Sequence, residues 1–203
     1  EPTAIVLLNT DTGETEVLRC ETEATVDKGY LSAPEAIEFA TDNGLTAHAF
    51  YYAAYNQEYA GPDFEKPPLM VVSHGGPTGA ASTAFSLSYQ FWTSRGIAIL
   101  DVNYGGSTGF GTEYRRRLNG GWGIVDVADC VNGALFLARR GDVDEDRLII
   151  RGSSAGGYTT LAALTFHDVF RVGSSYYGIS DLEALASDKT SLHVTTVSRE
   201  TRS

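Results

Sequence analysis

The residues best suited to chemistry lie in one short segment, Gly152-Ser153-Ser154-Ala155-Gly156. It follows the apolar run 148–150 and precedes a stretch with helical apolar spacing, which predicts a sharp turn from a strand into a helix. A serine at the centre of such a turn stands clear of the sheet, and flanking glycines avoid steric collisions. We therefore expect Ser154 to be a nucleophile for acyl transfer. Ser153 is the competing candidate, but the Gly-x-Ser-x-Gly frame selects Ser154.

Acyl transfer also requires hydrogen-bond donors where negative charge develops on the substrate oxygen. The N–H of Ala155 is one expected donor, at the N-terminus of a helix whose dipole favours negative charge. The string His74-Gly75-Gly76-Pro77 follows the apolar run 69–72, and its Gly76 N–H is the expected second donor. An ordinary strand-terminating turn is the alternative, but the presence of Ser154 favours an oxyanion loop.

The elements that would position these residues alternate between strands and helices from residue 69 onward. Short apolar runs predict four strands, at 69–73, 97–102, 147–151 and 172–177. Apolar periodicity predicts helices at 85–94, 126–140 and 155–166. Strands that are joined through helices by short connections form a parallel sheet covered on both faces. The fold class is therefore α/β, with a mostly parallel sheet flanked by helices.

The first 54 residues are expected to form a β-rich segment. One hairpin is predicted around the turn at 11–14, and a second around Asn43-Gly44, which is a strong hairpin signal. Residues 55–68 are polar and end in a proline pair, so they are expected to be a surface loop that leads into a new unit. The predicted division is into residues 1–54 and 55–203, with the hairpins apart from the parallel sheet or at its edge.

The composition excludes several classes of function. With 26 acidic and 15 basic residues the net charge is −11, which opposes binding to nucleic acid. No apolar run approaches the ~20 residues that span a bilayer. Cys20 and Cys130 form no metal or redox motif, so no metal and no cofactor are expected. The N-terminus does not resemble a signal peptide, which favours a cytoplasmic location. The sequence does not indicate an oligomeric state.

Four strings, taken together and in order, resemble the prolyl oligopeptidase family of serine peptidases. They are His74–Pro77, the segment NYGGSTGFG at 103–111, Trp122-Gly123 with Asp126 and Asp129, and the segment 152–158. The most similar subgroup is the acylaminoacyl-peptidase and dipeptidyl-aminopeptidase branch. The resemblance implies an α/β-hydrolase catalytic domain that follows a β-propeller, and residues 1–20 would be the end of the last propeller blade. Gly105 departs from the pattern, because relatives commonly have arginine there.

The resemblance also implies a reaction, the hydrolysis of peptide bonds through an acyl-enzyme on Ser154. It places Ile179 and Leu182 in the pocket for the residue before the scissile bond. The catalytic acid and base of this fold follow the nucleophile in the chain, on later strands that we do not find here. From Lys189 to Ser203 the sequence no longer follows the family pattern, so this segment is expected to be a frame-shifted or alternatively spliced terminus.

None of the four histidines is a convincing general base. His74 belongs to the expected oxyanion loop, and structural roles are expected for His48 within a strand and His167 at a helix end. His193 follows the nucleophile but has no motif around it. We therefore expect the chain to lack the Asp and His of a catalytic triad and to be a poor catalyst alone.

Three functions remain open at this stage. The first is a serine peptidase, which is favoured by Gly157 after the nucleophile turn and by the propeller-like N-terminal segment. The second is a carboxylesterase that uses the same turn. The third is a truncated product without catalytic activity that binds a partner or misfolds, and the missing acid and base support it.

Overall fold

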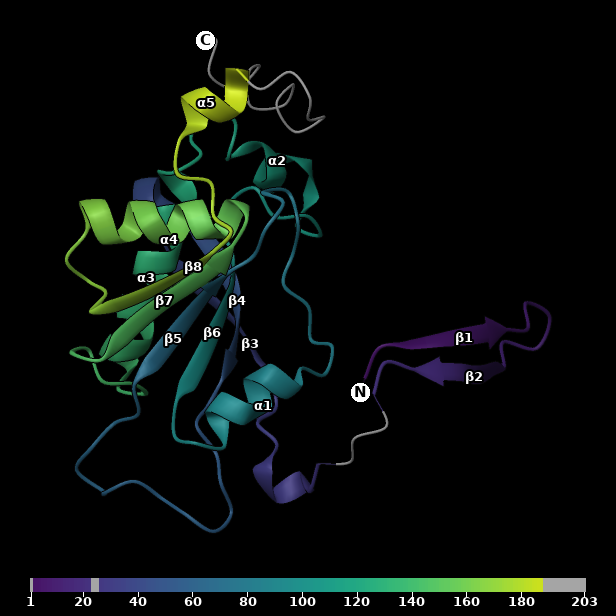
Figure 1. Ribbon diagram of the computed structural model, residues 1–203. Helices are drawn as coiled ribbons and strands as arrows, with labels where there is room; N and C mark the ends of the chain where they lie inside the picture. Colours follow the sequence, from purple (N-terminus) through teal and green to yellow (C-terminus); the bar gives the residue numbers. More distant parts are fainter. Residues whose placement is uncertain (1, 23–25, 188–203) are drawn as a thin grey trace.

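The computed structural model describes residues 2–22 and 26–187 of the 203-residue chain (Figure 1). A separate two-stranded sheet contains β1 (Ala4–Leu8) and β2 (Thr15–Cys20). A six-stranded sheet has the order β3-β4-β6-β5-β7-β8. Its strands are β3 (Glu35–Ala40), β4 (Thr46–Tyr52), β5 (Leu69–Ser73), β6 (Ala98–Asn103), β7 (Leu148–Ser153) and β8 (Val172–Tyr176). The helices are α1 (Leu87–Thr93), α2 (Gly111–Arg116), α3 (Val125–Arg140), α4 (Ala155–Phe166) and α5 (Leu182–Ser187), and 3-10 turns lie at Lys28–Tyr30 and Asp42–Gly44.

The four strands expected to be parallel are parallel, with β5 between β6 and β7 and with β8 beside β7. The β5 run is buried along almost its whole length, as a central strand of a sheet covered on both faces must be. Helices α3 and α4 pack on one face of the sheet and α1 on the other (Figure 1). The predicted α/β class is therefore confirmed, and no described helix is long and apolar enough to span a membrane.

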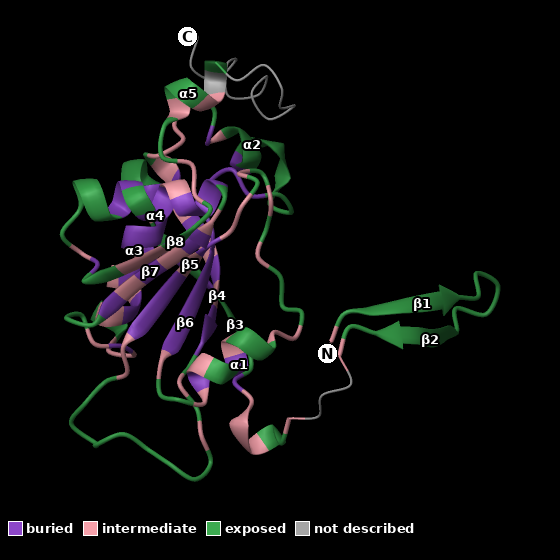
Figure 2. Ribbon diagram, viewed as in Figure 1, coloured by how far each residue is buried: buried purple, intermediate pink, exposed green. Residues whose placement is uncertain are grey.

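The second hairpin belongs to the main sheet. Strands β3 and β4 pair antiparallel with each other, and β4 pairs antiparallel with β6. Phe39 and Ala49 from this hairpin lie in the same core as Leu100 from β6. The division expected at residue 54 therefore falls between strands of one sheet. The β1–β2 hairpin alone stands apart, with every side chain of both strands exposed (Figure 2).

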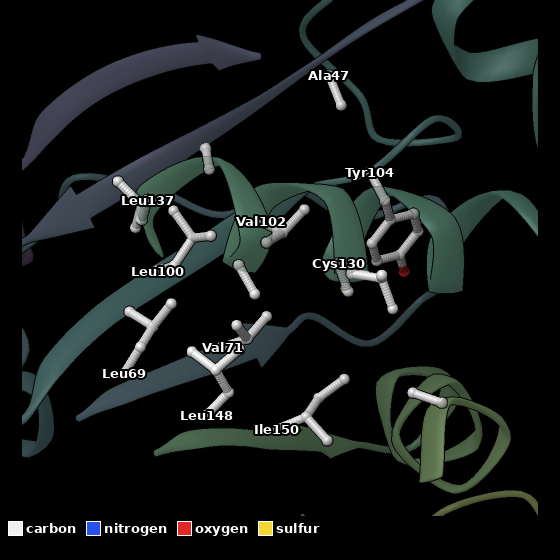
Figure 3. Close-up of a cluster of buried hydrophobic side chains, with 14 of the residues drawn as sticks. Ala47, Leu69, Val71, Leu100, Val102, Tyr104, Cys130, Leu137, Leu148 and Ile150 are labelled. Carbon is white, nitrogen blue, oxygen red and sulfur yellow. The ribbon is translucent and has the colours of Figure 1, made fainter. Parts of the chain in front are cut away.

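The main core lies between the sheet and the α3–α4 layer. Alternate residues of three adjacent strands point into it, as period-two geometry requires. Figure 3 shows these side chains, Leu69, Val71, Leu100, Val102, Leu148 and Ile150, around Leu137 and Cys130 of α3. A smaller cluster on the opposite face contains Tyr52, Met70 and Ile99, with Tyr89 and Trp92 of α1 packed against it. The two faces of the sheet thus differ in how completely they are covered.

The edge of the sheet at β8 is surrounded by exposed apolar side chains. In the described part of the chain, β8 pairs only with β7. Val172 on β8 is 58% exposed, and Phe166 at the end of α4 is 76% exposed. Apolar residues lie on all sides of α4, a pattern typical of a helix that is buried all round. An exposed apolar strand edge of this kind favours pairing between molecules.

Lysine in place of both Phe166 and Val172 is expected to reduce self-association, because charge at an edge strand opposes pairing between molecules. Size-exclusion chromatography with light scattering would show a lower average mass at equal concentration. The matched control is lysine at Tyr59 and Phe64, which are 75% and 88% exposed in the loop between β4 and β5. An equal effect of the control pair would show that total charge, rather than the β8 edge, governs association.

Candidate active site

Ser154 lies at the turn between β7 and α4, with φ 54° and ψ −119°. A residue other than glycine rarely adopts positive φ, and strained backbone of this kind is concentrated at functional sites. Ser154 itself is exposed, whereas Ala155 behind it is buried. Its N–H donates to the carbonyl of Tyr176 on β8 at 3.0 Å, and its own carbonyl accepts from Gly157 N at 3.0 Å. The expected strand-to-helix turn is present, and it is held from both sides.

The two glycines of the turn are required by close approach of backbone. A Cβ on Gly152 would collide with the carbonyl of Gly156, and a Cβ on Gly156 would collide with the carbonyl of Ser73 and lie 2.7 Å from that of His74. Neither glycine has positive φ, so space rather than backbone angle excludes other residues. The turn is thereby packed directly against the end of β5.

The loop that follows β5 lies beside Ser154. A Cβ on Gly75 would be 3.5 Å from the Cβ of Ser154 and 3.2 Å from the carbonyl oxygen of Ser153. Gly76 has φ 134°, which is a conformation open only to glycine, and it precedes a cis peptide bond to Pro77. The structure thus brings the His74–Pro77 loop and the Ser154 turn together, as an oxyanion loop and its nucleophile would be.

The ring of His74 holds this loop in place. Its Nδ1 lies 2.8 Å from the carbonyl oxygen of Gly75, and its Nε2 lies 2.7 Å from Oγ of Ser107. Burial lowers the pKa of His74, so the ring is neutral near pH 7. Because a carbonyl only accepts, Nδ1 carries the proton and Ser107 donates to Nε2. The ring also stacks on Tyr104 at 4.2 Å, and the Tyr104 hydroxyl is 3.0 Å from the carbonyls of both His74 and Pro77.

The other described histidines lie in structural surroundings. His48 stacks on Phe110 with ring centroids 4.4 Å apart, and His167 is the C-terminal cap of α4. No described side chain forms a hydrogen bond with the Ser154 hydroxyl. His193 and the segment 189–203 lie outside the described residues. In the described part of the chain, therefore, no base is in contact with the Ser154 hydroxyl.

The two residues expected in the substrate pocket follow β8. The N–H of Ile179 lies 3.4 Å from the carbonyl oxygen of Ser154, so this part of the chain passes directly beside the nucleophile. Leu182 is the first residue of α5 and is partly buried. Among the described residues, no three side chains are arranged to hold a metal ion.

Sequence reasoning missed a charged row on the α1 face of the sheet. Asp101 on β6 and Arg151 on β7 are both in register with Val72 on β5, so they flank it on the same face. The Asp101 carboxylate accepts a hydrogen bond from the Tyr89 hydroxyl at 2.8 Å, and the Arg151 guanidinium lies over the Tyr176 ring at 4.9 Å. A cavity of about 970 Å³ is lined by this row, by Ser153 and by the loop residues His74 and Gly75. The sequence signal that could have revealed this row is a charged residue directly after an apolar run, Asp101 after 97–100 and Arg151 after 148–150.

Comparison with known proteins identifies the family. The sequence model of the prolyl oligopeptidase family matches residues 83–201, which is more than half of the chain. The chain belongs to the prolyl oligopeptidase family. The family that the motifs resemble is thereby confirmed. We expected the family pattern to end at Asp188, but the match extends to residue 201.

Several prolyl oligopeptidase relatives are similar over part of their length. Dipeptidyl aminopeptidase BIII of Pseudoxanthomonas mexicana is 37% identical over 121 residues, which cover 59% of this chain and 18% of that protein. Acylamino-acid-releasing enzyme 1 of Oryza sativa subsp. japonica is 39% identical over 93 residues, or 46% of this chain and 12% of that protein. The structure of a Mycobacterium tuberculosis puromycin-hydrolyzing peptidase is 45% identical with a TM-score of 0.91, and the match covers 98% of this chain and 30% of that one. The chain spans less than a third of each relative, and the α/β-hydrolase fold is confirmed.

Gly156→Ala is expected to destabilise this prolyl oligopeptidase chain by about 1–3 kcal/mol or more, because the new methyl group would collide with the end of β5. Urea unfolding would measure the loss. Gly61→Ala is the matched control, since a Cβ on Gly61 meets no atom within 4 Å. If Gly156→Ala were as stable as the control, the turn would not be packed against Ser73.

Asp101 is expected to make the stability of the chain depend on pH. Burial raises its pKa from 3.8 to about 7, with the Tyr89 hydrogen bond opposing the shift. Between these values the folded state holds a proton that the unfolded chain releases, so the contribution of Asp101 to stability is greatest below pH 4 and falls as the pH rises to about 7. Asp101→Asn keeps an acceptor for Tyr89 but cannot ionise. Its stability should exceed that of the unsubstituted chain by a few kcal/mol at pH 8, since one pKa unit is about 1.4 kcal/mol.

The test for Asp101 is urea unfolding at several pH values from 4 to 8. The advantage of Asp101→Asn should shrink towards pH 4, where the carboxyl is protonated in the folded chain and partly protonated in the unfolded chain. The exposed Asp63→Asn is the control. An advantage of the same size at pH 4 and pH 8 would contradict ionisation as the cause.

Proposed function

We propose that this chain carries the nucleophile half of a serine peptidase active site, in which Ser154 attacks the carbonyl carbon of a peptide bond. The observation that carries this proposal is the turn itself, where an exposed serine with φ 54° stands between β7 and α4 beside Gly75. Family membership supports the reaction class. Residues 1–20, whose hairpin stands apart from the main sheet, are proposed to be the end of a propeller blade.

The proposed oxyanion hole combines the N–H groups of Ala155 and Gly76. Ala155 is the first residue of α4, so its N–H has no partner within the helix and is aligned with the helix dipole. Gly76 belongs to the loop that the His74 ring fixes beside the turn. Each such donor contributes roughly 3 kcal/mol to transition-state stabilisation in related chemistry. The two donors would lower the barrier for attack by Ser154.

Completing the reaction needs a base that accepts the Ser154 proton, because a serine hydroxyl is a weak nucleophile at its free pKa. In this fold the acid and base follow the nucleophile in the chain. The described residues place no base against Ser154, so we propose that acid and base come from polypeptide beyond α5. Without them, an oxyanion hole and substrate binding retain only about 10³–10⁴-fold acceleration over water.

The proposed substrate is a peptide, and Ile179 and Leu182 are proposed to line the pocket for the residue before the scissile bond. An acylaminoacyl peptidase that is 30% identical, with a TM-score of 0.69, has been solved in complex with Z-Gly-Gly-Phe-chloromethyl ketone. Its bound inhibitor supports a peptide-binding cleft in this family. A carboxylesterase would use the same turn, and comparing aminoacyl-arylamides with short-chain acyl esters separates the two activities.

The 203-residue chain is expected to react slowly but selectively with excess fluorophosphonate at Ser154, while its turnover of aminoacyl-arylamides stays near background. Peptide mass spectrometry would locate the adduct. Ser154→Ala should abolish the adduct, and Ser153→Ala, the matched control at the neighbouring position, should keep it. Rapid amide turnover that His193→Ala abolishes would contradict the claim that the chain lacks a base. An adduct that survives Ser154→Ala would contradict the assignment of Ser154 as the nucleophile.

A further inference from the structure

Two buried carboxylates lie one helical turn apart on α3. Asp126 and Asp129 are 0% and 2% exposed, and neither forms an ion pair with a described residue. Burying an unpaired carboxylate is costly unless hydrogen bonds satisfy it. Both residues belong to the motif that begins at Trp122-Gly123, and neither takes a direct part in the proposed reaction of Ser154. Their hydrogen bonds show what they hold.

Asp126 connects α3 to the start of the nucleophile helix. One of its oxygens accepts from the N–H of Gly123 at 2.6 Å, and the other accepts from the hydroxyl of Thr159. Thr159 lies one turn into α4, and its hydroxyl is also 3.3 Å from the carbonyl oxygen of Ala155. The carboxylate of Asp126 is therefore attached to the first turn of α4, where the proposed Ala155 donor lies.

Asp129 connects α3 to the support of the oxyanion loop. One of its oxygens accepts from the N–H of Gly105 at 2.6 Å, and the other accepts from the hydroxyl of Thr41. Gly105 directly follows Tyr104, whose ring stacks on His74 and whose hydroxyl reaches the carbonyls of the His74–Pro77 loop. The carboxylate of Asp129 therefore fixes the residue next to the one that supports this loop.

We propose that Asp126 and Asp129 are positioning residues. Together they fix the distance and orientation between the two proposed oxyanion donors, the N–H groups of Ala155 and Gly76. Helix α3 is a rigid element of 16 residues, and it holds the α4 donor through Asp126 and the loop donor through Asp129. Donors of this kind must be held within about 0.5 Å of the productive geometry, which supporting hydrogen bonds provide. The inference rests on the proposed function of the site.

The chemistry of these bonds suggests matched variants. Each carboxylate accepts from one backbone N–H and one hydroxyl, and a hydroxyl can also accept. Asparagine can therefore keep both bonds, by accepting from the N–H and donating to the threonine oxygen. Leucine has similar volume and makes neither bond. Asp126→Leu and Asp129→Leu test the two links separately, and the asparagine variants should restore what leucine removes.

Amide hydrogen exchange measured by NMR on the full chain is the readout. Gly157 and Tyr158 donate to the carbonyl of Ser154 and report on the turn, whereas Gly106 and Ser107 report on the loop after β6. Asp126→Leu should accelerate exchange about tenfold or more in the first pair only, and Asp129→Leu in the second pair only, since the loss of a hydrogen bond to a buried carboxylate makes local opening easier. A merely structural role would accelerate both pairs equally, together with the amides of β6.

Three further variants complete the test. Thr159→Val keeps the shape of the side chain but removes the hydroxyl, and with it the bond to Asp126 and the contact with the Ala155 carbonyl. It should therefore accelerate exchange at Gly157 and Tyr158 even if Asp126→Leu fails to fold. Asp42→Leu, at an exposed carboxylate, should change neither pair. Unchanged exchange in Thr159→Val, or asparagine variants that behave like leucine, would overturn the proposal. Failure of Ser154 to react with fluorophosphonate would count against the proposed function alone, because the exchange pattern does not depend on that reaction.

Discussion

The site depends on the close approach of two backbone segments that leave no room for a side chain. Gly156, at the start of α4, lies against the carbonyl of Ser73 at the end of β5. Because β5 ends at this contact, the loop that follows it begins beside the turn, and Gly75 lies next to Ser154. One packing contact therefore fixes Ser154 against its candidate oxyanion loop, and a methyl group at position 156 would collide with the end of β5.

Strand order explains why this contact can form. Strand β5 lies between β6 and β7, so the carboxyl ends of three neighbouring parallel strands open onto the same edge of the sheet. Binding sites of open α/β sheets lie at this edge. The loop after β5, the glycine-rich segment after β6 and the turn after β7 consequently converge, and Tyr104 and His74 connect the first two of them. Helix α3 packs behind β5 and β6 and against α4, and it carries the buried carboxylates that reach the convergent segments.

The two faces of the sheet serve different purposes. The face under α3 and α4 is apolar and supplies most of the core, which makes the strand ends rigid. The face under α1 is less completely covered and carries Asp101 and Arg151 on either side of Val72. Because the cavity over this row reaches Ser153, changes of charge on the α1 face act close to the nucleophile turn.

The sequence by itself predicted the four parallel strands and the strand-to-helix turn at Ser154, because these follow from local geometry. The runs 69–72 and 148–150 are apolar on both faces, which only a central strand requires. The glycines around Ser154 are required by a turn that is formed within five residues. The place of His74–Pro77 followed from its position directly after one of these strands.

Only the tertiary structure decided which distant segments meet. The hairpin 35–52 joins the main sheet through β6, so the division expected at residue 54 does not coincide with a break in the sheet. The row of Asp101 and Arg151 exists because β5 separates their strands, and the links of Asp126 to Thr159 and of Asp129 to Gly105 join residues far apart in the chain. Local periodicity shows which face of its own element a side chain occupies. The partner across the core is decided by packing between elements, and the sequence of one element does not show which other element packs against it.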